Sequence, residues 1–455
     1  MSRVNVISVI GAGQCIMCRL TNNSIAITVL FAIIINSALA LSYQDMSGEQ
    51  LNDIKTLSTA CNNFIIPLYK VYDHYIFIFY INYIYESFLV YNLSFQSLTT
   101  NTNSNVIISP LSLHMILSLL SNGAGGSTLN ELKSVLHYDN IVSANDKFKT
   151  LIFLLKGIEN IELHIANKIY VQDGFDLMAE FLAICTNVFQ SSISRLNFKN
   201  NELAVKTINS WVQEATNNKI FDIISSDDID EDTRIMLINA IYFKSKWLHK
   251  FDEMNTVKRK FYISKTETNL VPTMFKTSKY AYGKISIWDT TFIEIPYLNQ
   301  DIVMIILLPD RETELQVLEN NFNWKTLADE PRSINEIALY LPKFKFEITV
   351  DLKDTLRKIG LNTIFEDDAD FTQLSNIPLK VSHALQKIFI EINEEGSEAA
   401  AATVVGMRLR RMATLPMEFM VNRPFMFAIE HKPSRVPLFL GSVRKIEFFQ
   451  ERDEL

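Results

Sequence analysis

The segment from Glu394 to Thr403 constrains the fold of this chain more than any other stretch of its 455 residues. It reads Glu-Glu-Gly-Ser-Glu-Ala-Ala-Ala-Ala-Thr, and no proline follows before Leu415, so each residue could donate a ladder hydrogen bond. Strand side chains alternate between faces. One face would carry Ser397, Ala399, Ala401 and Thr403, and the other Glu398, Ala400 and Ala402. This small-residue segment could enter a sheet over a packed core, whereas composition alone would favour an alanine-rich helix.

A basic run lies shortly after this segment. It contains Arg408, Arg410 and Arg411 within the sequence Arg-Leu-Arg-Arg. A guanidinium group binds a carboxylate through two parallel hydrogen bonds, so a protease cleft lined with acidic residues would favour this run. A segment that can become a strand, followed by a protease bait, suggests a protein that acts by being cut.

Further motifs, in a fixed order along the chain, carry a family resemblance. They are Asn105–Ser112, Asn209–Val212 with Thr216–Ile220, Leu237–Trp247, Val271–Met274, Leu341–Phe344, Ser382–Ala384, and Asn422–Phe425 with Phe439–Gly441. Together with the hinge segment, these motifs resemble those of the inhibitory serpins. The resemblance extends from about residue 50 to residue 448. The predicted hinge and reactive-centre loop occupy residues 394–421, within a single domain of residues 41–451.

The resemblance implies an α+β serpin fold with three β-sheets, about nine helices and an exposed, metastable reactive-centre loop. It also implies suicide inhibition: a protease cuts the loop, the hinge inserts into the large sheet, and the acyl-enzyme is trapped before hydrolysis. The catalytic serine belongs to the protease. The chain itself is therefore expected to be no enzyme, to need no cofactor and to bind no metal.

Several positions acquire roles only through the resemblance. A polar cluster beneath the opening point of the sheet is matched by Ser109, Ser112, Asn239 and His383. The zone where the loop enters is matched by Trp247, Lys343 and Glu394, of which Glu394 and Lys343 would form an ion pair. Gly396 belongs to the hinge motif. Without the resemblance, His383 and Trp247 would be ordinary core residues.

The position of the scissile bond stays open between two neighbouring sites. Cleavage at Arg411–Met412 places Arg408 four residues before the bond, as furin-like proprotein convertases require, and lies fifteen residues after Gly396. Cleavage at Arg410–Arg411 lies fourteen residues after Gly396, the more usual loop length, and suits a trypsin-like protease. Another interpretation is a processing site that is cut without inhibition.

Both ends of the chain predict passage through the secretory pathway. Ile25–Ile35 is an apolar run of eleven residues, too short to span a bilayer, and Ala38-Leu39-Ala40 follows as a cleavage pattern. Residues 1–40 are therefore expected to be a signal peptide, with Met17 as an alternative start. The last four residues, Arg452, Asp453, Glu454 and Leu455, resemble a retrieval address read by a KDEL-type receptor. We expect residence in the endoplasmic reticulum and Golgi, with secretion as the alternative.

Bulk properties agree with a monomeric inhibitor of this kind. The net charge of −8 gives no reason to expect nucleic-acid binding. The seven histidines show no metal-ligand spacing, and no stable membrane insertion is expected. Beyond the signal peptide the cysteines are Cys61 and Cys185, which we expect to be buried thiols. A non-inhibitory chaperone of the endoplasmic reticulum remains an alternative, because one serpin group ends in the same four residues.

Residues 71–96 do not fit the family pattern. They include ten Phe or Tyr residues and no Lys or Arg. Removing them joins Phe64–Lys70 to Ser97 and restores the family's spacing, and Val71 and Gln96 allow the codons that begin and end an intron. The sequence therefore predicts a retained-intron insertion. The rival interpretation is a membrane-touching or partner-binding hairpin, although Asp73, His74 and Glu86 disfavour a spanning helix.

Overall fold

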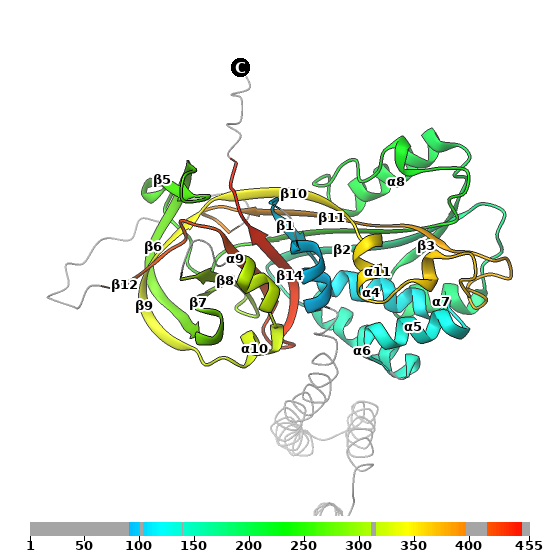
Figure 1. Ribbon diagram of the computed structural model, residues 1–455, viewed down its shortest axis with the longest axis horizontal. Coiled ribbons are helices and arrows are strands. Elements are labelled where there is room, and N and C mark those ends of the chain that lie inside the picture. Colours follow the sequence, from blue (N-terminus) through cyan, green and yellow to red (C-terminus); the bar gives the residue numbers. More distant parts are fainter. Residues whose placement is uncertain (1–90, 101–102, 139, 311–314, 397–415, 448–455) are drawn as a thin grey trace, which may run out of the picture. The chain divides into compact units, whose positions relative to one another are not determined.

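The computed structural model describes residues 91–100, 103–138, 140–310, 315–396 and 416–447 (Figure 1). All of them belong to the compact unit that begins at Tyr80. This unit combines helices with mixed β-sheets, which is the α+β class that the sequence predicts. None of the described helices is long and apolar enough to cross a membrane.

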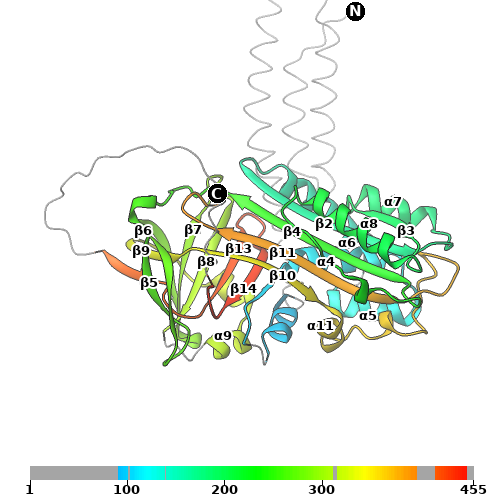
Figure 2. The same cartoon turned by 90° about the horizontal axis from the view of Figure 1, so that it is seen from above.

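The five-stranded sheet contains the two strands that position the candidate site. Its order is β10 (Phe344–Asp351), β11 (Val381–Ile392), β4 (Ile235–Ser245), β2 (Ile161–Gln172) and β3 (Ser192–Leu196). β11 and β4 run parallel in the middle, with Gln386 opposite Asn239. We call the line of contact between these two strands the seam. Figure 2 shows β4, β11 and β10 as neighbouring strands, and the pairing of β11 with β4 ends at Phe389 opposite Tyr242.

The second hydrogen-bonded sheet has nine strands and divides in two at one long strand. Its order is β1 (Val106–Ile108), β14 (Val436–Val443), β13 (Phe425–His431), β8 (Ile302–Pro309), β7 (Thr290–Pro296), β6 (Thr268–Ile285), β9 (Ser333–Pro342) and β12 (Met417–Met420). β5 (Val257–Tyr262) also pairs with β6. The beginning of β6 pairs with β5, its middle with β9 and its end with β7. This one strand therefore joins two of the three sheets that the resemblance implies.

The helices flank the five-stranded sheet and cap the second one. In addition to the helical residues 91–99, they are α4 (Pro110–Ser121), α5 (Gly126–Leu136), α6 (Ile141–Lys156), α7 (Ala179–Asn187), α8 (Asn201–Ala215), α9 (Leu315–Asn321), α10 (Trp324–Asp329) and α11 (Lys353–Lys358). Ser109 caps α4 by accepting a hydrogen bond from the Ser112 amide, and Pro110 occupies the first helical position, where no amide hydrogen is needed. Every residue of α4 is buried, so the helix lies inside the molecule.

Both faces of the five-stranded sheet are buried, which explains why β4 is almost entirely apolar. Alternate residues of β4, such as Ile238 and Tyr242, join the smaller core under α8. The residues between them, such as Leu237 and Ile241, join the main core with α4. The polar Asn239 alternates with Leu237 and Ile241, so its side chain points to the same face as theirs, toward the main core and α4.

The end of the predicted insertion packs into the fold. Within residues 91–99, Tyr91, Asn92, Ser94 and Phe95 are buried. The side-chain oxygen of Asn92 accepts the Trp324 amide hydrogen at 2.9 Å, and the ring of Phe95 lies edge-on to Phe322. Residues 91–96 are thus part of the core of this chain. The preceding residues of the predicted insertion, 71–90, lie outside the described part.

The same helix contains a polar defect. The Ser94 hydroxyl oxygen is fully buried and has no hydrogen-bond partner. If residues 71–96 were absent, the restored spacing would place Ile66 at the position of Asn92 and Leu68 at that of Ser94. Burying a leucine side chain stabilises by about 1.5–3 kcal/mol, which exceeds the roughly 1 kcal/mol of the lost Asn92 hydrogen bond.

The same shift places Pro67 at the position of the exposed Leu93 within the helix, where a proline costs up to about 3 kcal/mol. We therefore expect the chain without residues 71–96 to fold with a melting temperature close to that of the full chain, which thermal unfolding of the two proteins measures. Ser94→Ala in the full chain is the control, and it should raise the melting temperature because it removes the buried hydroxyl that has no partner. An unfolded deletion protein, or mature transcripts that all contain these codons, would contradict the insertion hypothesis.

Candidate functional site

The chain reverses direction where β11 ends, directly beside the end of β4. Asn393 and Gly396 exchange two backbone hydrogen bonds of 3.2 and 3.3 Å and form an isolated antiparallel bridge. This bridge is the first rung of a hairpin with β11. Gly396 has φ of +113°, and a side chain there would place a Cβ 2.3 Å from the Ser245 carbonyl oxygen. Only glycine fits this turn.

Glu394 fastens the turn to the body of the protein. Its side chain is 6% exposed, and its two oxygens bind different partners. One oxygen lies 2.8 Å from the Lys343 ammonium group, and the other accepts the Thr256 hydroxyl hydrogen at 2.8 Å. Its backbone oxygen accepts the Phe251 amide hydrogen at 3.0 Å. The ion pair expected between Glu394 and Lys343 is therefore present.

The ionisation of Glu394 follows from these contacts. Burial alone would raise the pKa of its carboxyl group, but hydrogen bonds from Lys343 and Thr256 outweigh burial and lower the pKa below its usual value. The carboxylate is thus the bound form. Its contribution to the closed turn is present above the ordinary glutamate pKa and is lost as the pH falls through the lowered pKa.

Trp247 holds the other side of the turn. Its backbone amide donates to the backbone oxygen of Glu395, and its indole nitrogen donates to the backbone oxygen of Asn393, both at 2.9 Å. Its ring stacks on Tyr297 with 4.3 Å between centroids. The residues Trp247, Lys343 and Glu394 therefore meet as the sequence predicts. We call this group, with Gly396, the hinge anchor.

A polar cluster crosses the middle of the seam beneath the start of α4. The Gln386 amide nitrogen donates to the Asn239 oxygen at 2.6 Å and to the Ser109 carbonyl oxygen at 3.2 Å, and its oxygen accepts the Ser109 amide hydrogen at 2.9 Å. The Asn239 amide nitrogen in turn donates to Ser112 and to Asn167 on β2. All five residues are buried. The cluster joins α4 to three neighbouring strands.

His383 is not part of this cluster, so its predicted placement is wrong. It lies near the start of β11, opposite Met236, and its electrostatic neighbours are Asp351, Lys353 and Asp230. Burial lowers the pKa of its imidazole. The residue beside Asn239 is Gln386, three positions further along the strand. Gln386 and Asn167 were missed, although each is the uncharged polar member of an otherwise apolar row of alternate strand residues that faces the main core.

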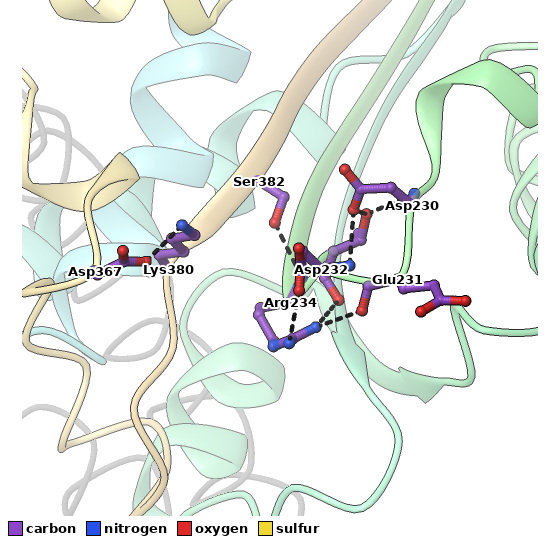
Figure 3. A network of polar contacts seen from close by, with 8 residues as sticks. Asp230, Glu231, Asp232, Arg234, Asp367, Lys380 and Ser382 are labelled. Carbon is purple, nitrogen blue, oxygen red and sulfur yellow. Dashed lines mark hydrogen bonds and ion pairs between the residues drawn. The ribbon is translucent and has the colours of Figure 1, made fainter.

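A second polar network closes the seam at the end far from the hinge anchor (Figure 3). The Arg234 amide, just before β4, donates to the Ser382 hydroxyl on β11 at 3.0 Å. The Arg234 guanidinium group donates to the backbone oxygen of Glu231 at 2.9 Å and lies 3.4 Å from a carboxylate oxygen of Asp232. The bond to Ser382 joins the beginnings of the two strands, and the guanidinium contacts hold the turn before β4, so the seam is fastened at both ends and in the middle.

The remaining predicted residues cannot be placed. Residues 397–415 lie outside the described part, and with them lie the small residues of the hinge from Ser397 to Thr403 and the basic run Arg408–Met412. The terminal residues 1–90 and 448–455 are also outside it. In the described ranges no group of three or more His, Cys, Asp or Glu residues could hold a metal. Cys185 is a buried free thiol, and burial raises its pKa to about 12.

We expect Gln386→Leu to destabilise the protein by about 2–3 kcal/mol, because it leaves the buried side-chain oxygen of Asn239 and the backbone amide of Ser109 without partners. Urea or thermal unfolding measures the change. His383→Ala is the matched control on the same strand and should change stability by less than about 0.5 kcal/mol. Equal effects of the two substitutions would contradict the assignment of Gln386 to the seam.

Comparisons with known proteins agree with this geometry. The family model described as "Serpin (serine protease inhibitor)" matches residues 87–446. Antichymotrypsin-2 of Bombyx mori is 38% identical over 346 residues, covering 75% of this chain and 92% of the relative. Human neuroserpin is 34% identical over 361 residues, covering 76% and 87%.

Solved structures show the same fold. Serpin48 of Tenebrio molitor has a TM-score of 0.74 at 31% identity, covering 81% of this chain and 98% of that one. Human thyroxine-binding globulin, solved with its hormone, has a TM-score of 0.72 at 28% identity, covering 80% and 98%. The match to the family model over most of the chain and the identity to full-length relatives establish that the chain belongs to the serpin family.

Proposed function

We propose that this serpin inhibits a furin-like proprotein convertase by suicide trapping, with cleavage at Arg411–Met412. The observation that carries the proposal is the Asn393–Gly396 bridge, which directs the chain back along β11 on the side that faces β4. A hairpin that continues from this bridge has to enter the seam. The relatives include an antichymotrypsin and an antitrypsin of Bombyx mori, whose names agree with protease inhibition.

The register of this hairpin supports insertion of the hinge. Extending the antiparallel pairing places Ser397 opposite Ile392, Ala399 opposite Ile390, Ala401 opposite Ile388, and Thr403 opposite Gln386. These four β11 residues are buried on the side of the main core. Residues directly opposite each other share a face, so small hinge side chains would come to lie where the core leaves little room.

The basic run supports a convertase as the target. Arg408 and Arg411 have the spacing that these proteases require, and both can bind acidic clefts bidentately. We propose that a signal peptide of residues 1–40 directs the protein into the secretory pathway and that residues 452–455 retain it in the endoplasmic reticulum and Golgi through a retrieval receptor. The inhibitor would then share its compartment with maturing convertases.

Two other functions remain candidates. The target could instead be a trypsin-like protease that cleaves the loop at Arg410–Arg411, which gives the more usual loop length. A non-inhibitory role, such as a chaperone of the endoplasmic reticulum, is compatible with the fold, because thyroxine-binding globulin shares it and is described as a hormone complex. The intact alanine run at residues 399–402 favours inhibition over this alternative.

Incubation with furin tests the target. We expect a complex that survives SDS and a released carboxy-terminal fragment that begins at Met412, both measured by mass spectrometry. Arg408→Ala should abolish trapping of furin and leave trapping of trypsin, because trypsin needs only one arginine. A fragment that begins at Arg411 would contradict the convertase assignment.

Ala401→Arg tests insertion of the hinge. The substitution would bury an unpaired charge beside Ile388, so we expect furin to cleave the variant without being trapped. Glu398→Arg is the matched control, since its register position faces the partly exposed Glu391 on the opposite side of the sheet. The ratio of complex to cleaved protein measures both. Full trapping by Ala401→Arg would contradict insertion in this register.

Deletion of Arg452–Leu455 tests the localisation. We expect the shortened protein to move from the cell into the medium, because a retrieval receptor can no longer bind it. Immunoblots of cells and medium measure the shift, and a four-residue alanine tail is the control for length. A full-length protein that is entirely outside the cell would contradict retention.

A further inference from the structure

β5 lies between the two points where the reactive segment joins the body. At its beginning, the Thr256 hydroxyl donates to Glu394 at 2.8 Å, just before the loop departs. At its end, the Tyr262 amide donates to the backbone oxygen of Asn422 at 2.8 Å, just after the loop returns. β5 and β12 occupy the same end of the body in Figure 1. A protease that holds the loop must therefore approach this strand.

The side chains of β5 divide into an inner and an outer row. Arg259 and Phe261 point inward: the Arg259 guanidinium group lies 4.7 Å from the centre of the Tyr340 ring, and Phe261 is fully buried. Lys258 and Lys260 belong to the outer row and are exposed. This alternation puts two ammonium groups on one surface, as a strand requires.

Exposed apolar side chains surround these lysines. Leu270, opposite Lys260 on β6, is 59% exposed, and Met254, just before β5, is 85% exposed. Met417 on β12, at the same end of the body in Figure 1, is another exposed large apolar residue. Flexible methionines with apolar and basic neighbours form the kind of surface that binds other proteins.

The nearby acidic residues do not neutralise the outer lysines. In the described residues no ion pair involves Lys258 or Lys260, although Glu253 and Glu418 remain exposed at the rim. Asp252 acts on the charge of Lys276, and Glu267 acts on that of Lys445. The hinge carboxylates are bound as well, Glu394 by Lys343 and Glu395 by Lys250 at 2.5 Å.

We propose that Lys258 and Lys260, with Met254 and Leu270, form a second docking surface for the acidic catalytic domain of the protease that holds the loop. This inference rests on the proposed function. The two lysines attract the protease to an inhibitor whose net charge of −8 would otherwise repel it, and the apolar side chains pack after contact. Such steering acts mainly on the association rate and weakens with salt.

The test compares two charge-reversed inhibitors with equal net charge. One is Lys258→Glu/Lys260→Glu. The control is Lys199→Glu/Lys206→Glu, two exposed lysines at α8, which lies at the other end of the body in Figure 1. The association rate constant for covalent complex formation with furin is measured at low and at physiological ionic strength, together with the stoichiometry of inhibition and the melting temperature of each variant.

We expect the β5 variant to associate about tenfold more slowly at low salt, with a smaller difference at physiological salt, and with unchanged stoichiometry. The α8 control should change the rate by less than about twofold. Leu270→Ser adds an uncharged variant that should slow association at both salt concentrations.

Three outcomes would overturn this surface. The β5 variant and the α8 control could slow association equally, which would show that the rate depends on the net charge of the protein and not on the position of the lysines. The β5 variant could form the complex as fast as the wild-type protein, which would contradict this docking surface but leave the proposed function intact. A loss of rate that occurs only with added heparin would assign the lysines to an acidic polysaccharide. If the wild-type chain forms no complex, the proposed function itself fails.

Discussion

The parallel pairing of β4 with β11 is the constraint on which the rest of this structure depends. Parallel strands are normally covered on both faces, and here α4 and α8 provide that cover. The pairing is fastened by Gln386 and Asn239 in the middle, by Arg234 and Ser382 at one end, and by the hinge anchor at the other. These contacts thus keep closed the place where, on the proposed mechanism, the cut loop would enter as an additional strand.

The hinge anchor gives this closed seam its direction of opening. Gly396 brings the chain into backbone contact with the end of β4, and the bridge to Asn393 already reverses it along β11. Glu394 holds the turn through a buried carboxylate whose lowered pKa depends on Lys343 and Thr256. On the proposed mechanism, a loop that is cut beyond this point would add rungs from the existing one, first beside the last residues of β11 and then between the paired parts of β4 and β11.

The sequence predicts this site where local motifs determine it and fails where strand register does. Glu394, Lys343 and Trp247 lie within short motifs, and the structure brings them together. His383 was misplaced because register, which is irregular between Val381 and His383, decides which polar side chain faces Asn239. Composition marked residues 71–96 as foreign, yet could not reveal that residues 91–96 fill part of the core.

The melting temperature of the protein before and after a single cut in the loop tests the central claim most directly. If the hinge inserts between β4 and β11, the cut chain gains a central strand with its hydrogen bonds and buried side chains, and the account predicts that it melts at a much higher temperature than the intact chain. A cut chain that melts at the same temperature or lower would contradict insertion into the seam.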